Sequence, residues 1–331
     1  MKPSGEDAVA SLPVENVALA RIDPVDETLR ITTAEDSDDL CRSIATLGLL
    51  TAPILQAAAG GAYRVVSGFR RVAACRRLGR ALIPARLLGP EADPSLVVRL
   101  AIGDNSGQRA LNLIEQSRAI GLMRSVLPPN QDLGQALGSL GISLNSALAG
   151  KIGLLAGLAG VIQEGVLAGN LSLAMALELG GMPAGEGRLL AELFAELKPS
   201  LNKQREIVTL ASEIALRDGL DLAALFSSQP LAAMRNAPEM DRNQKLRQIR
   251  QILHRMRYPE LSRFEGRVAQ ALGRIRLGPG LSLTPPRHFE SPTWTATLAF
   301  DSRAALGAAH RALGRLMADP AFKRILEKRD L

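Results

Sequence analysis

The sequence predicts a multidomain α+β protein: a small mixed α/β N-terminal domain, an all-α middle domain, then basic helices with a small α/β C-terminal segment. Short strand patterns alternate with helix patterns over the first 110 residues, and helix patterns alone follow. Two arginine-rich amphipathic helices then precede two strand-like runs. Since 331 residues suit two or three domains, we place the domains at 15–110, 111–230 and 240–331.

The composition narrows the class of protein. Aromatic residues make up only 3% of the chain, which argues against a base-stacking platform for single strands. Cys41 and Cys75 lie in helical patterns without metal-ligand spacing, and the three histidines are scattered. We see no leader pattern and no apolar run long enough for a membrane span, so we expect a cytoplasmic, nucleoid-associated protein without a membrane partner.

Each element of the N-terminal domain has a local signal. Strands are predicted at 17–22, 51–55, 63–66 and 83–88, with Gly60 and Gly61 turning a hairpin between the second and third. A helix is predicted over 36–48, capped by Ser37 or Asp38, with an apolar line formed by Leu40, Ile44 and Leu47. A second helix follows Gly68 and ends at Gly79.

The turn between the third strand and the second helix predicts an anion site. Ser67 and Gly68 allow a tight turn, and Arg70 and Arg71 lie in the first turn of the helix. The positive end of the helix dipole and two guanidinium groups would meet there, which suits a phosphate. An ordinary strand–helix corner with a solvated basic face is the alternative for this stretch taken alone.

Two boxes in the N-terminal domain together resemble a known family. The first is the run SGFRRVAACRRLG from Ser67, and the second is Asp104-Asn105, Arg109, Leu111-Asn112 and Glu115. In this order and spacing they resemble the N-terminal domain of ParB-type chromosome- and plasmid-partition proteins, a fold that sulfiredoxin shares. The likeness covers residues 15–125 most closely.

The resemblance implies binding of CTP and Mg²⁺ in a protein that closes as a clamp on DNA. By position, the phosphates would meet Ser67, Gly68, Phe69, Arg70, Arg71, Asn105 and Arg109, and the metal would meet Asp104 and Asn105. The chain departs from the family pattern at three points. Phe69 replaces a glutamate, Asp104 replaces a glutamate, and the interval from Asn105 to Arg109 is one residue longer. Nuclease activity is not expected, because no acidic cluster has two-metal spacing.

The middle domain contains a candidate helix-turn-helix over 132–158. Helices are predicted at 133–140 and 144–158, separated by Gly141-Ile142-Ser143. Asn145, Ser146 and Lys151 are the residues of the second helix suited to base edges or phosphates. A helical hairpin that only spaces the domains is the alternative. Further helices are predicted at 160–168, 172–179, 187–197 and 200–218, and Gln229-Pro230 is expected to break the next one.

Two basic helices, over 241–257 and 260–277, are the second candidate for DNA contact. Between Arg242 and Arg276 there are ten Lys and Arg residues and two acids, Glu260 and Glu265, a local balance of 10 − 2 = +8 against +7 for the chain. The arginines follow helical spacing beside an apolar seam, and those predicted to contact DNA are Arg247, Arg250, Arg257, Arg263, Arg267 and Arg274. A solvated basic face is the alternative.

The C-terminal segment is predicted to form a strand pair, 281–283 and 294–300, followed by helices at 304–317 and 320–326 that dock on the basic helices. The sequence thus favours a ParB-like, CTP-gated DNA-binding protein, a homodimer with a partition ATPase as a further partner. Two alternatives remain open: an interaction scaffold that keeps the fold without binding nucleotide, and a weak CTPase or phosphotransferase.

Overall fold

A computed structural model describes residues 12–34, 38–275, 277–278, 280–286, 289 and 291–326. The predicted helix start at Asp36, its candidate cap Ser37, and Arg276 lie outside these residues. The chain divides into two compact units, Met1–Leu201 and Asn202–Leu331. The predicted boundary at residue 110 falls within the first unit, and the three-domain division stays a prediction. Among the described helices, none has the length and apolar character that crossing a bilayer requires.

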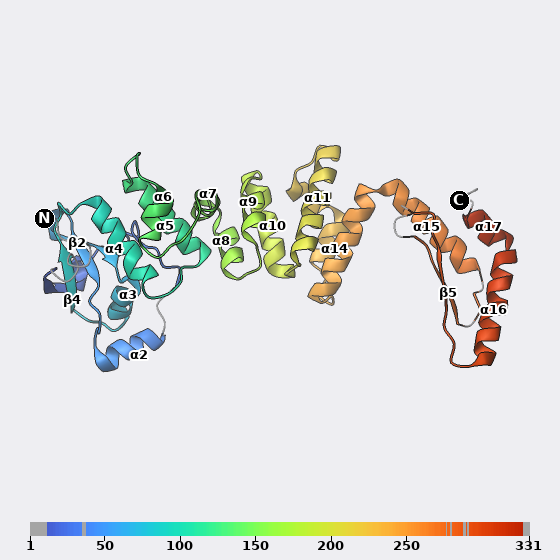
Figure 1. Cartoon of the computed structure of the whole chain (residues 1–331), viewed down its shortest axis with the longest axis horizontal. Helices are drawn as coiled ribbons and strands as arrows, with labels where there is room; N and C mark the ends of the chain where they lie inside the picture. Colours follow the sequence, from blue (N-terminus) through green and yellow to red (C-terminus); the bar gives the residue numbers. More distant parts are fainter. Residues whose placement is uncertain are drawn as a thin grey trace. The chain divides into compact units, whose positions relative to one another are not determined.

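A four-stranded mixed sheet organises the N-terminal domain (Figure 1). Its order is β1 (Val14–Ala18), β4 (Leu82–Leu88), β2 (Ile54–Ala57) and β3 (Tyr63–Ser67). β2 and β4 run parallel, while β1–β4 and β2–β3 are antiparallel. The predicted hairpin is confirmed, with a one-turn 3-10 helix at Ala59–Gly61.

The predicted first strand, 17–22, is wrong in its position. The strand begins at Val14, because residues 14–18 pair in register with residues 82–86 of β4. Leu19–Arg21 then forms one turn of 3-10 helix, and Ile22 keeps only an isolated bridge to Tyr63.

Helices cover both faces of this sheet. α2 (Asp38–Leu47) and α3 (Phe69–Arg77) pack on the face that carries Leu55 and Val65. α4 (Pro94–Ser106) packs on the opposite face, which carries Ile54 and Val66. Successive strand residues point to opposite faces, so each strand supplies both cores.

The predicted apolar line of α2 needs one correction. Cys41 and Ile44 are buried, but Leu47 is 64% exposed. The buried pair lies three residues apart on the face toward α3, and Leu47, three residues further at the end of the helix, is not covered.

The rest of the first unit is helical. It comprises α5 (Leu113–Val126), α6 (Leu133–Gly138), α7 (Ser146–Ile152), η3 (Leu155–Gly157), α8 (Gly160–Leu167), α9 (Leu173–Gly180) and α10 (Ala184–Leu197). α6 and α7 form the predicted helical pair, but the predicted second helix, 144–158, is too long. It ends at Ile152, because the Ala156 N–H donates to Ser117 Oγ at 2.8 Å instead of to a carbonyl one turn back.

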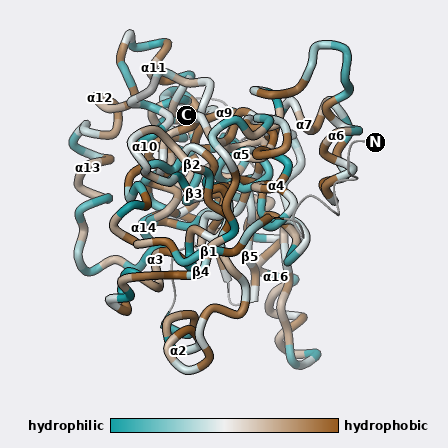
Figure 2. Tube along the Cα trace, turned by 90° about the vertical axis from the view of Figure 1, so that its left-hand side faces the viewer, coloured by the Kyte–Doolittle hydropathy of each residue, from teal (hydrophilic) through white to brown (hydrophobic). Residues whose placement is uncertain are grey.

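The second unit begins with α11 (Leu201–Asp218), α12 (Leu222–Ser227), α13 (Gln229–Arg235) and α14 (Arg242–Arg257). The predicted stripe of α11 is confirmed, since Ile207 and Ile214 are fully buried. The predicted break at Gln229-Pro230 is confirmed: α12 ends at Ser227, and α13 begins at Gln229 with Pro230 in its first turn, where no N–H is needed. Along the tube of Figure 2, brown and teal alternate within individual helices, as expected when one face is buried.

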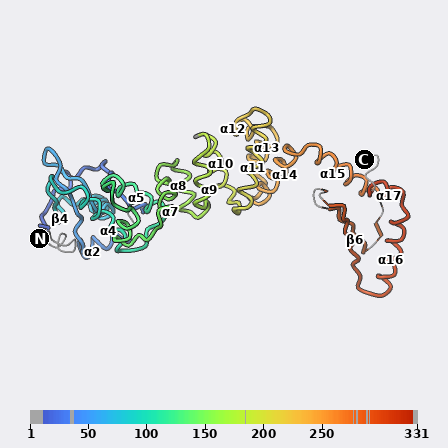
Figure 3. The backbone as a smooth tube through the Cα atoms, turned by 45° about the horizontal axis from the view of Figure 1, so that its top comes forward, coloured from blue at the N-terminus to red at the C-terminus, as the bar shows by residue number. Residues whose placement is uncertain are grey.

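The end of the second unit joins α15 (Pro259–Arg274) to a hairpin of β5 (Leu281–Thr284) and β6 (Thr295–Leu298), and to α16 (Arg303–Ala318) and α17 (Pro320–Leu326). The predicted strand pair and its docking on the second basic helix are confirmed. Val268 of α15 shares one apolar cluster with Leu281, Leu316 and Ile325. The hairpin lies beside α16 (Figures 1 and 3).

Candidate functional site

The turn between β3 and α3 has the backbone that the sequence predicts. Gly68 is the N-cap of α3 in the left-handed region, with φ 91°. A Cβ at this position would lie 2.8 Å from Cβ of Pro53, so space as well as φ requires glycine. Gly68 offers no side chain to cap the helix, and the positive end of α3 lies at the turn.

A carboxylate from the end of α4 reaches this turn. Asp104 accepts a short hydrogen bond from Ser67 Oγ and a second from Arg71 Nη2, which lies 2.8 Å from Asp104 Oδ2. Arg71 Nη1 also donates to the carbonyl of Thr51 at 3.0 Å. Asp104 thus joins β3, α3 and α4, and it occupies one edge of the Arg71 guanidinium.

A cavity of about 180 Å³ opens at this turn. Every residue predicted for phosphate or metal lines it, together with three that the sequence did not indicate. Its lining residues are Thr32, Leu40, Ser67, Gly68, Phe69, Arg70, Arg71, Asp104, Asn105, Gln108 and Arg109. Three arginines and one acid give the described lining a positive balance, so the cavity suits an anion.

A second cavity, of about 290 Å³, shares Phe69 and Arg70 with the first. Its other lining residues include three acids from the loop after β1, namely Asp23, Asp26 and Glu27. Phe69 also packs on both apolar cores beside the sheet. The ring of Phe69 therefore has a packing role as well as a place in the lining of both cavities.

The residues proposed for Mg²⁺ fit an ion that a phosphate ligand helps to hold. Asp104 supplies carboxylate oxygens to the cavity, and Gln108 Nε2 donates to its Oδ1 at 3.1 Å. Asn105 Nδ2 donates to the carbonyl of Ala101 at 2.8 Å, so its amide oxygen is the atom left for an ion. Among the described residues, no three His, Cys, Asp or Glu side chains form a metal cluster. Mg²⁺ commonly combines one or two protein ligands with substrate phosphates.

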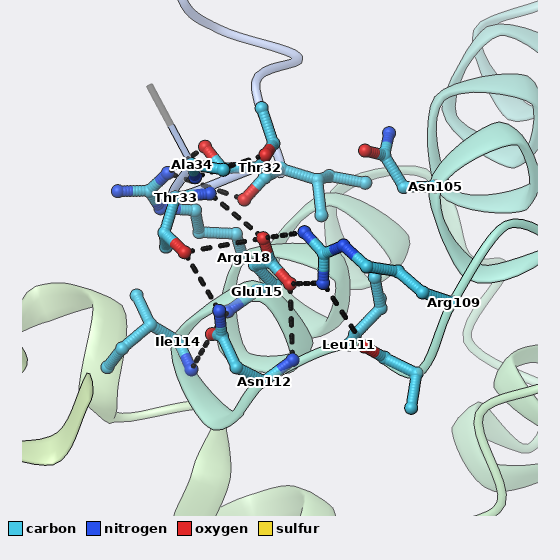
Figure 4. Close-up of polar contacts among 12 residues, drawn as sticks. Thr32, Thr33, Ala34, Asn105, Arg109, Leu111, Asn112, Ile114, Glu115 and Arg118 are labelled. Carbon is cyan, nitrogen blue, oxygen red and sulfur yellow. Dashed lines mark hydrogen bonds and ion pairs between the residues drawn. The ribbon is translucent and has the colours of Figure 1, made fainter. Parts of the chain in front are cut away.

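Arg109 faces an acid that lies outside the cavity lining. Its Nη1 and Nη2 donate to Glu115 Oε2 and Oε1 at 2.7 and 2.6 Å (Figure 4). Glu115 is fully buried, whereas the Arg109 side chain is 46% exposed. The predicted phosphate ligand is therefore held in a two-point ion pair at the wall of the cavity.

Glu115 also completes the cap of α5. Asn112 Oδ1 accepts from the N–H of Glu115 at 3.0 Å, and Glu115 Oε2 accepts from the N–H of Asn112 at 3.1 Å. The spacing Asn-x-x-Glu before an apolar run is a capping-box signal, and it could have assigned this pairing from the sequence.

The ionisation of Glu115 gives a testable pH dependence. Burial raises its pKa, but hydrogen bonds from Arg109, Thr33 and Asn112 outweigh burial and lower the pKa to about 2. Because the folded pKa lies below the unfolded value, the stabilisation is complete above about pH 4.5 and is lost as the pH falls toward 2.

We expect the wild type to lose on the order of 2 kcal/mol of unfolding free energy through this group between pH 5 and pH 2. Glu115→Gln should show a smaller loss over the same interval. Urea unfolding at a series of pH values measures this. If the unfolding free energies of the two proteins fall in parallel between pH 5 and pH 2, Glu115 does not contribute to the loss.

The candidate helix-turn-helix residues have modest surroundings. Asn145 is the N-cap of α7, and its Oδ1 accepts from the N–H of Leu148 at 2.8 Å. Ser146 and Lys151 are exposed at the two ends of this seven-residue helix. Asn145 thus has a capping role, and contact of Asn145, Ser146 and Lys151 with DNA stays a prediction.

The basic ridge of α14 is partly neutralised by acids from α11. Arg250 Nη2 lies 2.6 Å from Glu206 Oε2, and Arg257 Nε lies 2.5 Å from Glu213 Oε2. Arg250 and Arg257 of the predicted basic ridge are therefore paired with acids, and their contact with DNA stays a prediction. Counting charges along 242–276 could not include acids that the fold brings from another helix.

The remaining predicted DNA ligands lie on the surface. Arg247 of α14 and Arg267 and Arg274 of α15 are exposed, and Arg263 pairs with Glu260 of its own helix at 2.6 Å. Arg247 and Arg250 also line a cavity of about 490 Å³ with His254 and Arg255. This part of the second unit keeps a basic surface on α14 and α15.

Comparison with known proteins gives one family match. Residues 2–106 match the model of the ParB N-terminal domain. No curated protein matches the chain at a significant level.

Solved structures similar to this chain include three of ParB proteins. One is C-terminally truncated ParB from Caulobacter crescentus complexed with CTP-γ-S, with 21% identity, a TM-score of 0.26, and coverage of 56% of this chain and 99% of that one. A second is C-terminally truncated ParB from the same organism complexed to the centromeric parS site, with 17% identity, a TM-score of 0.32, and coverage of 57% of this chain and 96% of that one. A third is a Pnob8-like ParB-N domain, with 16% identity, a TM-score of 0.36, and coverage of 74% of this chain and 98% of that one.

Proposed function

We propose that this chain, whose residues 2–106 match the model of the ParB N-terminal domain, is a CTP-gated DNA-binding protein that acts in DNA partition or its regulation. The observation that carries the proposal is the 180 Å³ cavity, where eight residues from two distant boxes of the sequence come together. They supply a glycine turn, a helix N-terminus and three arginines, and these groups suit a nucleoside triphosphate.

The residues that line the cavity have different roles in the proposed binding of the phosphates and Mg²⁺. Gly68 and the first turn of α3 would receive phosphate oxygens, and Arg70 and Arg109 of the lining would pair with their charge. Mg²⁺, held by Asp104 and the amide oxygen of Asn105, would shield charge between phosphates. Arg71 is bonded to Asp104, so its first task is to orient that carboxylate.

The adjoining cavity suits a nucleobase that carries an amino group. It shares Phe69 and Arg70 with the phosphate cavity, and we place the base of the nucleotide there. Asp23 and Asp26 supply carboxylate oxygens, which accept hydrogen bonds and do not donate them when ionised. These acceptors suit the amino group of a base such as cytosine, and Arg30 and Arg76 of the same lining supply donors for its carbonyl and ring nitrogen.

DNA contact is assigned to the second unit and to the helical pair of the first. Arg247, Arg267 and Arg274 are the exposed cations of α14 and α15 best placed for phosphates. Ser146 and Lys151 of α7 would contribute within the first unit. A cytoplasmic, nucleoid-associated location and a partition ATPase as partner belong to the same proposal.

The C-terminal hairpin suits a homodimer. β6 pairs only with β5 among the described residues, and Thr295, Ala296 and Thr297 are exposed. Phe300, two residues beyond the end of β6, is 56% exposed. A second copy that pairs along β6 would satisfy the strand edge and cover apolar surface.

Ala296→Pro tests this dimer. The Ala299 N–H donates to the Gly280 carbonyl, and by the alternation of an antiparallel ladder the Ala296 N–H points away from β5. Proline there removes an outward donor only, so we expect a monomer with an intact fold. Sedimentation equilibrium measures the mass, with Ala304→Pro, in the first turn of α16, as the control. If the Ala296→Pro variant dimerises with the same affinity as the wild type, pairing along β6 is ruled out.

Calorimetry with CTP, UTP, ATP and GTP in the presence of Mg²⁺ tests the function. Saturable binding that prefers CTP over UTP supports the proposal, and repeating the titration with long duplex DNA tests the gating. Salt-sensitive DNA binding without CTP binding would instead favour a scaffold that keeps the fold.

Binding is better supported than catalysis. Among the described residues that line the phosphate cavity, Asp104 is the one acid, and Ser67, Arg71 and Gln108 already donate to it. The proposal assigns this carboxylate to Mg²⁺, so the described lining offers no second acid to act as a general base. Release of phosphate from CTP by the purified chain would favour the CTPase alternative.

A further inference from the structure

We propose that Glu115 is a positioning residue, whose buried carboxylate fixes Arg109 and the segment 31–33 and so sets two walls of the 180 Å³ cavity. The proposal rests on the proposed function, because it concerns how the site for the nucleotide phosphates keeps its shape. Glu115 itself does not line the cavity; Arg109 and Thr32 do.

The first wall is Arg109. Its side chain is half exposed, and a long cationic side chain in that setting samples many rotamers. The two-point pairing with Glu115 fixes the plane of the guanidinium, and Arg109 Nη1 also donates to the carbonyl of Ala110 at 3.1 Å. A ligand would then meet a guanidinium that is already oriented.

The second wall is the segment that follows the buried Ile31. Glu115 Oε1 accepts from the N–H of Thr33 at 3.0 Å and from its hydroxyl at 3.3 Å. Asn112 Nδ2 donates to Thr33 Oγ1 at 2.8 Å, and Arg118 Nη1 donates to the carbonyl of Thr32 at 3.0 Å. Figure 4 shows these groups converging on Glu115 from two segments far apart in sequence. Thr32 is thus fixed at the cavity by the bond from Arg118 to its own carbonyl and by the bond from the next residue, Thr33, to Glu115.

Capping of α5 does not by itself account for this carboxylate. The capping box of α14 uses Gln244 at the same position, neutral and exposed. Burying an ionised carboxylate is costly unless several donors compensate it. At Glu115 those donors include Arg109, which lines the cavity, and Thr33, the neighbour in sequence of the lining residue Thr32. The charge thus fixes the cavity wall in addition to capping α5.

A double-mutant cycle with Arg109 tests the assignment. Glu115→Gln keeps the shape and the cap but removes the charge, and we expect it to weaken CTP binding about tenfold, measured by calorimetry with Mg²⁺. In the Arg109→Gln background the same change should cost less than about twofold. Equal losses in both backgrounds would overturn the proposal, because a merely structural role does not depend on Arg109.

Two further variants guard the result. Arg109→Lys keeps the charge but loses the two-point pairing, and it should bind CTP more weakly than the wild type even if Glu115→Gln fails to fold. Wild-type affinity in Arg109→Lys would overturn the proposal. Glu192→Gln removes an exposed pair with Arg188 on α10 and should change nothing.

Hydrogen exchange without ligand separates this proposal from the proposed function. In Glu115→Gln we expect faster exchange in peptides that cover 29–34 and 107–112, compared with the wild type. Unchanged exchange would overturn the positioning role, whether or not CTP binds. If the wild type binds no nucleotide, the proposed function fails, and the exchange data still decide whether Glu115 holds these segments.

Discussion

Replacing Arg70 by alanine is expected to weaken CTP binding about 10- to 100-fold, the loss of one or two charge-assisted hydrogen bonds. Arg70 lines both cavities at the turn, so we expect it to contact a ligand in either one. Lysine at this position should recover part of the affinity, because it restores the charge without the planar fork. Calorimetric titration with CTP and Mg²⁺ measures both variants.

Arg99→Ala is the matched control for Arg70. Arg99 lies on α4 of the same domain, is partly exposed and does not line either cavity. Its variant should bind CTP as the wild type does. Wild-type affinity for CTP in a folded Arg70→Ala protein would disprove the site. An equal loss of affinity in both variants would indicate that the net positive charge of the domain, and not a contact of Arg70, attracts the ligand.

The affinity for duplex DNA is expected to fall about 100-fold between 50 and 200 mM salt. Three to four arginines of α14 and α15 that contact phosphates would give a log–log slope of about −3 to −4. Five uncompensated arginines, as the sequence alone suggests, would give a slope of about −4 to −5. The smaller value follows because Arg250 and Arg257 are paired with Glu206 and Glu213.

Two single variants distinguish these arginines. Arg267→Gln should reduce the steepness of the slope by about one, and the exposed position makes loss of stability small. Arg250→Gln should leave the slope nearly unchanged and instead lower the free energy of unfolding, because it leaves Glu206 without its partner. The opposite pattern would show that the ion pairs open when DNA binds. Fluorescence anisotropy with a labelled duplex measures the slopes.

Local chemistry could be predicted from the sequence where it depends on neighbours in the chain. The left-handed turn at Gly68, the hairpin at Gly60-Gly61 and the C-terminal strand pair all follow from backbone preferences over a few residues. The meeting of Ser67 with Asp104 was expected only from the family resemblance, since no periodicity relates two residues so far apart.

Contacts made by irregular segments were beyond the sequence. Thr32 and Gln108 line the cavity because tertiary contacts hold their loops there, and neither lies in a periodic pattern. The predicted long helix over 144–158 failed for a related reason. A hydroxyl on another helix, Ser117 Oγ, takes the Ala156 N–H that a continued helix would have used.

The core beside α4 sets a limit on which fragments of this protein can be isolated. That core takes Ile54 and Val66 from the sheet, but also Ile120 and Met123 from α5 and Ile152 from α7. A fragment cut at residue 106, where the family match ends, would expose the apolar face of α4 to water and would be prone to aggregate. A fragment that retains α7 would close this core, so the shortest soluble piece carrying the cavity should extend beyond Ile152.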